Sequence, residues 1–175
     1  MLIITFLILI LNLIVLPQSI KENVDKAIEN CFGKTIRIEY DKLKIEDKLK
    51  IHIEKEVGQK FYSDEVYLYR IFNENNLIGY GLLDNVIGKS LPITFLVLYD
   101  NSGTILCSEI IKYREPYGGA VQSKDWNEQF KGKNHNSDFK VGKDINGISG
   151  ATISVYSVTK GIKKLTLLLN NIFDK

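Results

Sequence analysis

Small side chains gather in residues 146–154, NGISGATIS, directly before a long segment with an apolar stripe. Glycine and alanine let a ligand approach the backbone closely, and Thr152 adds a hydroxyl whose role can go beyond donating a hydrogen bond. If a helix starts here, its free N–H groups and the positive end of its dipole favour a phosphate group. The segment is therefore a candidate phosphate-binding turn, and the alternative is a purely structural turn with a good helix cap.

A helix that could present such a turn must come from the residues that follow. The first of these are rich in β-branched side chains and locally favour a strand. Over a longer stretch, apolar residues recur at spacings of three and four, namely Val155, Val158, Ile162, Leu165, Leu169 and Ile172. The longer pattern predicts a helix, with Ser149 as its cap and Gly150, Ala151 and Thr152 in its first turn.

Two further helices are expected near the start of the chain. Ser19 can cap a helix that runs through about Cys31 and stops at Gly33. Residues 46–58, EDKLKIHIEKEVG, have the pattern of a charged amphipathic helix that ends at a glycine. Residues 35–40 between them alternate like a strand.

The middle of the chain predicts two consecutive hairpins, because strand-like runs are separated by polar turns at residues 73–76 and 100–103. The predicted strands are residues 65–72, 77–86, 91–99 and 104–113. A polar stretch around Trp126 predicts a short helix, and a loop follows. The predicted fold class is α+β, an antiparallel sheet of hairpins packed with flanking helices.

Composition bounds the functional classes. The chain has 175 residues, of which 45% are hydrophobic, enough for one ordinary domain with a core. Its 23 basic and 21 acidic residues give a formal net charge of +2. Such a balance provides no broad basic face, so we expect no nucleic-acid partner.

The first 16 residues are apolar apart from Thr5 and Asn12, and Pro17 closes this run. The run is short for a membrane-spanning helix, which needs about 20 apolar residues, and is typical of a secretory signal. No basic residue precedes it and no good cleavage site follows. Residues 1–19 are therefore expected to be a signal peptide or an uncleaved membrane anchor, with a buried core helix as the alternative.

The residues that often bind metals or form crosslinks are scattered. Cys31 and Cys107 lie far apart without a C-x-x-C spacing; they could pair in an oxidising compartment, but two separate, mostly buried thiols are expected. His52 and His135 are isolated from each other and from the cysteines. No zinc-binding pattern can be assembled from them, and His52 is expected to be a structural surface residue.

The NGISGATIS segment resembles the flavinylation motif of the FMN-binding domain in the G subunit of Rnf-type electron-transport complexes and the C subunit of sodium-pumping NADH:quinone oxidoreductase. In that family an Asp or Asn opens the motif, and the Thr after Ser-Gly-Ala receives FMN through a phosphodiester bond. The resemblance places these two positions at Asn146 and Thr152.

A second segment, residues 113–133, YREPYGGAVQSKDWNEQFKGK, resembles the stretch that precedes the attachment motif in these subunits. Together with the preceding hairpin, the resemblance covers roughly residues 75–173. It divides the chain into a targeting segment, residues 1–19, an N-terminal helix and strand portion, residues 20–74, and an FMN-binding domain, residues 75–175.

The resemblance implies an extracytoplasmic electron-transfer flavoprotein in a membrane-associated redox chain, with membrane oxidoreductase subunits or other redox proteins as partners. It implies a separate flavin transferase that uses FAD and magnesium, so that Thr152 is an acceptor and no residue is catalytic. The expected cofactor-binding residues are Thr152, Ser149, Gly150, Ala151, Ile153, Ser154, Glu115, Tyr117, Gly118 and Gly119.

Several roles stay open at this point. Glu115 can hydrogen-bond the cofactor or hold its own loop, and Ser154 can contact the phosphate region or have no capping role. Tyr117 can border the flavin ring, whereas Trp126 is expected to be structural. Two other functions remain as alternatives: an extracytoplasmic flavin-dependent reductase of a small molecule or quinone, and a non-redox, membrane-anchored interaction module.

Overall fold

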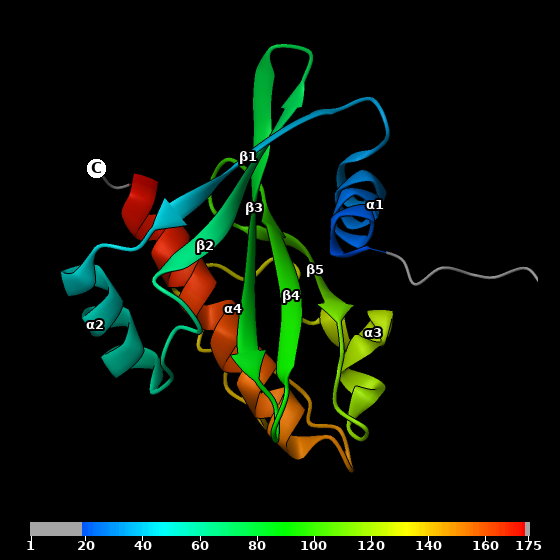
Figure 1. The fold of residues 1–175 in the computed structure, drawn as a ribbon, viewed down its shortest axis with the longest axis vertical. Coiled ribbons are helices and arrows are strands. Elements are labelled where there is room, and N and C mark those ends of the chain that lie inside the picture. Colours follow the sequence, from blue (N-terminus) through cyan, green and yellow to red (C-terminus); the bar gives the residue numbers. More distant parts are fainter. Residues whose placement is uncertain (1–18, 174–175) are drawn as a thin grey trace, which may run out of the picture.

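The computed structural model describes residues 19–173 (Figure 1). The elements in chain order are α1 (Ile20–Phe32), β1 (Arg37–Lys44), α2 (Asp47–Val57), β2 (Glu65–Asn73), β3 (Asn76–Ile87), β4 (Pro92–Tyr99), β5 (Ile105–Lys112), the 3-10 helix η1 (Gly119–Gln122), α3 (Lys124–Glu128) and α4 (Thr152–Phe173). The predicted α+β class is confirmed.

The strands form one antiparallel sheet in the order β1-β2-β3-β4-β5. The two predicted hairpins are its β2–β3 and β4–β5 pairs, so both predictions are confirmed. The predicted strand at residues 35–40 is longer than expected: it runs from Arg37 to Lys44 and pairs along β2, with Arg37 opposite Phe72. The sheet therefore continues across the boundary expected between residues 74 and 75.

Local signals explain the ends of the first two helices. The Ser19 hydroxyl accepts a hydrogen bond from the backbone N–H of Glu22, whose side chain in turn accepts one from the backbone of Ser19. Gly33 ends α1, and Gly58 ends α2 in the left-handed conformation, with φ of 65°. These helix boundaries agree with the sequence prediction.

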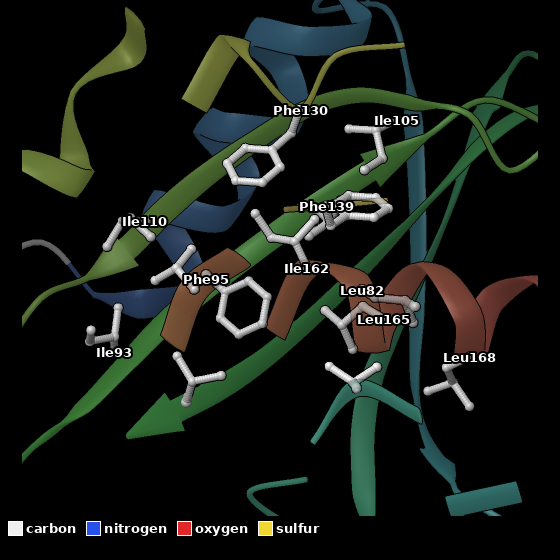
Figure 2. Close-up of a cluster of buried hydrophobic side chains, with 14 of the residues drawn as sticks. Leu82, Ile93, Phe95, Ile105, Ile110, Phe130, Phe139, Ile162, Leu165 and Leu168 are labelled. Carbon is white, nitrogen blue, oxygen red and sulfur yellow. The ribbon is translucent and has the colours of Figure 1, made fainter. Parts of the chain in front are cut away.

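Each face of the sheet has its own apolar cluster. Along β4, Phe95 and Val97 join the larger cluster under α4 and α2, whereas Leu96 and Leu98 join a smaller cluster under α1. Figure 1 shows α4 running diagonally across one face of the sheet. Figure 2 shows how side chains from α4, the sheet and the segment before α4 interlock in the larger cluster.

The two cysteines form a disulfide that links the end of α1 to β5, with their Cα atoms 6.3 Å apart. The expectation of two separate buried thiols is therefore wrong, and both residues are only half-buried. The physical reason lies in tertiary packing: Val24, Ala27 and Ile28 seat α1 on the sheet and bring Cys31 over Cys107, from which it is separated by 76 residues.

Among residues 19–173, no helix combines the length and the apolar composition that crossing a bilayer requires. Residues 1–18 of the expected signal peptide or anchor lie outside the described residues.

Candidate functional site

The turn before α4 differs from the predicted helix start. The backbone N–H of Ala151 donates to the carbonyl of Ile148 at 3.1 Å, and Gly150 has a left-handed φ of 77°. The carbonyl of Ala151 accepts the first helical hydrogen bond, from Val155 at 2.9 Å. Because left-handed Gly150 cannot belong to the helix, α4 begins at Thr152 and Ala151 takes the cap position. The prediction of Ser149 as the cap, with Gly150 and Ala151 in the first turn, is wrong.

This helix start leaves backbone donors free. The side chain of Ala151 has no oxygen that could accept a hydrogen bond and cap the helix. Within residues 19–173, no hydrogen bond occupies the backbone N–H groups of Thr152, Ile153 and Ser154. Ala151 itself is buried, so its methyl group anchors the turn in the core. The first turn of α4 therefore presents unsatisfied N–H groups and the positive end of a 22-residue helix.

The space around this turn is open. The side chain of Thr152 is exposed. A Cβ atom built on Gly150 would meet no other atom within 4 Å. A phosphate esterified to the exposed Thr152 hydroxyl would have open space beside Gly150, and the residues present fit the phosphate end of FMN.

Tyr113 brings the two sequence motifs together. Its hydroxyl donates to the carbonyl of Tyr117 at 2.6 Å and lies 2.8 Å from the hydroxyl of Ser154. Because the Tyr113 proton is committed to Tyr117, the hydroxyl of buried Ser154 donates to Tyr113. Ser154 thus fastens the first turn of α4 to the Tyr117 bend.

Gly118 makes this contact close. It has φ of 80°, and a Cβ atom there would lie 2.9 Å from the Tyr113 hydroxyl and 3.1 Å from the Ser154 hydroxyl. The same atom would lie 3.5 Å from the Cα atom of Ala151. Only glycine combines this backbone conformation with this approach. Gly119 follows as the first residue of η1.

Sequence reasoning did not single out Tyr113. The signal was its place at the end of β5, immediately before a bend rich in glycine, where a long side chain can reach a neighbouring segment.

Glu115 faces the β3–β4 loop. Its carboxylate accepts hydrogen bonds from the backbone N–H groups of Ser90 and Leu91 at 2.5 and 2.7 Å. These bonds hold the pKa of the Glu115 carboxyl below its usual value. The two roles left open for Glu115 were to bind the cofactor and to hold its own loop. This geometry supports holding a loop, but the loop is the one between β3 and β4.

Trp126 positions the start of the NGISGATIS segment. Its ring is buried, and its indole N–H donates to the carbonyl of Asn146 at 2.9 Å. The backbone N–H of Asn146 donates to the side chain of Gln129 at 2.7 Å. The structural role expected for Trp126 agrees with this arrangement. Trp126 in α3 and Gln129 directly after it hold the segment that leads into the turn.

Exposed apolar side chains surround the turn. Tyr117 is 83% exposed, and Ile153 and Tyr156 in the first turns of α4 are 51% and 48% exposed. Tyr156 lies on the same helix face as Thr152, four residues away. These side chains leave a surface where a planar ring or a partner protein can pack beside Thr152.

Comparison with known proteins agrees with this geometry. Residues 88–166 match the family model of the FMN-binding domain, a range that begins in the β3–β4 loop, contains both motifs and ends within α4. No curated protein matches the chain. This match supports an FMN-binding domain of that family within residues 88–166.

Proposed function

We propose that the protein is an electron-transfer flavoprotein that carries FMN covalently, through a phosphodiester bond to the Thr152 hydroxyl. The observation that carries this proposal is the exposed Thr152 side chain at an uncapped helix start, inside a family match to the FMN-binding domain. A free hydroxyl, free N–H donors and open space are what a phosphate ester at this position requires.

When bound, FMN supplies the redox chemistry of its isoalloxazine ring. The role of the chain is to hold it. The N–H groups of the first turn of α4 are positioned to donate to the phosphate oxygens, and the hydrogen bonds of Tyr113 fix this turn against the Tyr117 bend. Tyr117 and Tyr156 offer aromatic surface to the ring or to a redox partner. A covalent link keeps the carrier from losing its cofactor between donor and acceptor.

The attachment step balances with FAD as the donor. The Thr152 oxygen would displace AMP from the FMN phosphorus of FAD, so that one phosphodiester linkage would form as the pyrophosphate bond breaks. The hydroxyl proton leaves with the AMP product. A separate flavin transferase with magnesium catalyses this step, since the turn contains no acid, base or cationic side chain of its own.

The proposal extends to location and partners. The Cys31–Cys107 disulfide supports an oxidising compartment outside the cytoplasm. The apolar run over residues 1–16 supports export or membrane anchoring. We therefore place the flavin domain on the extracytoplasmic side of a membrane, where it relays electrons between redox proteins, in the manner of the Rnf G and sodium-pump C subunits that its motifs resemble.

The test is intact-mass spectrometry of denatured protein after co-expression with a flavin transferase. The unmodified sequence should gain the mass of FMN less water, and Thr152→Ala should gain nothing. Thr152→Ser should retain some adduct because the hydroxyl survives. Ser63→Ala, which removes an exposed hydroxyl outside both motifs, is the control and should be modified fully.

Two outcomes would overturn parts of the proposal. A flavin adduct that survives denaturation in Thr152→Ala would show that Thr152 is not the attachment residue. An unmodified chain from cells with an active transferase would refute covalent attachment and favour the interaction module. Turnover of a soluble acceptor by the loaded protein alone would favour a stand-alone reductase over a relay.

A further inference from the structure

A pocket of about 570 Å³ lies on the α1 face of the sheet, beside the N-terminal half of α1. Its volume is within the range of small-molecule sites, about 300–1,000 Å³. The residues that define its chemistry are Tyr40, Tyr67, Tyr69, Leu83, Asn85 and Arg114. None of these six residues belongs to the flavin site described above.

Phenol groups gather on one side of this pocket. The rings of Tyr40 and Tyr69 stack with their centroids 5.5 Å apart. Burial, with smaller contributions from the nearby Asp25, Tyr40 and Tyr67, raises the pKa of Tyr69 to about 12. Within the described part of the chain, the hydroxyls of Tyr40, Tyr67 and Tyr69 have no hydrogen-bond partner. Three hydroxyl donors on flat rings therefore line one wall.

Arg114 supplies the other donors. One nitrogen of its guanidinium donates to the carbonyl of Pro92 and to the hydroxyl of Thr94, both at 2.9 Å. Among residues 19–173, no carboxylate lies within ion-pair distance of this half-buried guanidinium, and its remaining N–H groups have no acceptor. Arg114 therefore brings an unneutralised positive charge to the pocket.

The other charged groups around the pocket are neutralised or face away. Lys21 pairs with Asp25 at 2.6 Å, and Lys42 pairs with Glu65 at 3.5 Å. Asp84 alternates with Asn85 along β3, so its carboxylate faces α4 on the opposite side of the sheet. The polar groups of the lining that remain available are hydrogen-bond donors, and they lie beside flat rings. The pocket therefore favours a planar, apolar molecule that carries acceptor oxygens.

We propose that this pocket binds a planar aromatic molecule with acceptor oxygens, of the quinone class. Its rings lie against the tyrosines and Leu83, while its oxygens accept hydrogen bonds from the phenols and from Arg114. Two carbonyls across a flat ring match donors that sit on two sides of one pocket. The inference concerns binding alone and needs no flavin.

The position of Arg114 connects this pocket to the flavin site. Arg114 directly follows Tyr113, whose ring reaches the first turn of α4. The guanidinium of Arg114 instead reaches Pro92 and Thr94, at the start of β4. Two consecutive residues therefore serve two sites, and a ligand in the pocket lies against the same segment that fastens the attachment turn.

The test is isothermal titration calorimetry with anthraquinone-2-sulfonate as the probe. The protein is the full chain in detergent, carrying the Thr152→Ala substitution. Arg114→Gln should weaken binding by about tenfold or more, since it removes a charge-assisted hydrogen bond. Tyr69→Phe removes only a hydroxyl and should weaken binding by a few fold. Arg37→Gln is the matched control, because Arg37 pairs with Glu39 on β1 outside the pocket, and it should bind the probe normally.

A second probe checks the ligand class. Anthracene-2-sulfonate has the same rings and charge without the carbonyl oxygens, and it should bind more weakly than the quinone. Equal binding of both probes would overturn the quinone assignment. Equal binding by Arg114→Gln, Tyr69→Phe and the unchanged pocket would overturn the site itself.

The outcome is separable from that of the proposed function. Covalent FMN is measured by mass in the chain with Thr152 intact, and probe binding is measured in the Thr152→Ala variant. An adduct without probe binding refutes the pocket alone. Probe binding without an adduct refutes the flavin attachment alone.

Discussion

The two faces of the sheet are held in different ways. On one face, the 22-residue α4 buries a long apolar stripe, consisting of Val155, Val158, Ile162, Leu165, Leu168 and Leu169. On the other face, the 13-residue α1 buries only Val24, Ala27 and Ile28. The α1 face carries the disulfide and the tyrosine-lined pocket, and the α4 face ends at the turn that we propose as the site of flavin attachment.

This difference indicates how each helix is kept in place. Apolar burial contributes roughly 25 cal/mol per Å² of surface removed from water, so α4 is held by its own packing. The smaller contact of α1 supplies less, and a covalent link between Cys31 and Cys107 compensates for it. A face that is not fully covered also leaves room for a ligand.

The largest effect is expected from shortening a buried side chain on the α4 face. Leu165→Ala should lower the free energy of unfolding by about 2–5 kcal/mol, because it removes apolar contact and leaves a cavity in a tightly packed cluster (Figure 2). Ile28→Ala is the comparison on the α1 face, where Ile28 is equally buried. There the helix can settle toward the sheet, so the loss should be near the low end of this range. Urea denaturation measures both.

Equal losses for Leu165→Ala and Ile28→Ala would show that the two faces are packed equally well. In that case the disulfide would not compensate for weak packing.

Removing the disulfide should have the next largest effect. The double variant Cys31→Ser and Cys107→Ser should lose about 2–4 kcal/mol, because the bond closes a loop over a sequence separation of 76. Hydrogen exchange should rise first in α1, with α4 still protected. Equal acceleration of exchange in α4 would contradict the idea that the crosslink serves α1 in particular. The unchanged protein with a reductant is the parallel control.

The sequence could predict features that depend on neighbouring residues. Ser19 and Glu22 cap α1 across one turn. The carboxylate of Asp100 accepts hydrogen bonds from the N–H groups of Ser102 and Thr104 and so shapes the β4–β5 turn. In these cases a few adjacent side chains determine the backbone, so periodicity and turn residues were sufficient to place the elements.

Other features depend on residues that meet only in the folded chain. The prediction placed the start of α4 at Ser149, but the helix begins at Thr152. The reason is that Gly150 is left-handed and the methyl group of Ala151 is buried in the core. The family motif still marked Thr152 as the candidate residue. The contact of Tyr113 with Ser154 joins positions 41 residues apart and has no local signature.

A large pH-dependent effect is expected from the α4 face, where Asp84 and Lys164 are both buried and interact electrostatically. Burial raises the pKa of Asp84 to about 6 from 3.8, and it lowers the pKa of Lys164 to about 8 from 10.5. Between pH 3.8 and about 6 the folded protein therefore binds more protons at Asp84 than the unfolded chain does. Stability should fall as the pH rises through this window, by up to about 3 kcal/mol from this group.

Asp84→Asn should remove that slope, because the amide does not titrate. Denaturant unfolding at several pH values between 4 and 7 measures it, with Asp41→Asn, an exposed position on β1, as the control. The same slope in Asp84→Asn and in the unchanged protein would exclude Asp84 as its source. Between about pH 8 and pH 10.5 Lys164 acts in the opposite direction: the unfolded chain holds a proton there that the folded protein has lost, so stability should rise with pH.

The smallest effect tests the point where the two faces meet, at the end of β5. Tyr113→Phe removes one hydroxyl and with it the hydrogen bonds to Tyr117 and Ser154, at a cost of about 1 kcal/mol in stability. Because these bonds hold the attachment turn, the rate of FMN transfer to Thr152 should fall several-fold while the final adduct still forms. Time-resolved intact mass during incubation with transferase and FAD measures this rate. Tyr62→Phe, an exposed tyrosine far along the chain from the turn, should leave the rate unchanged. An unchanged rate in Tyr113→Phe would mean that the helix start holds its geometry through Gly150 and Ala151 alone.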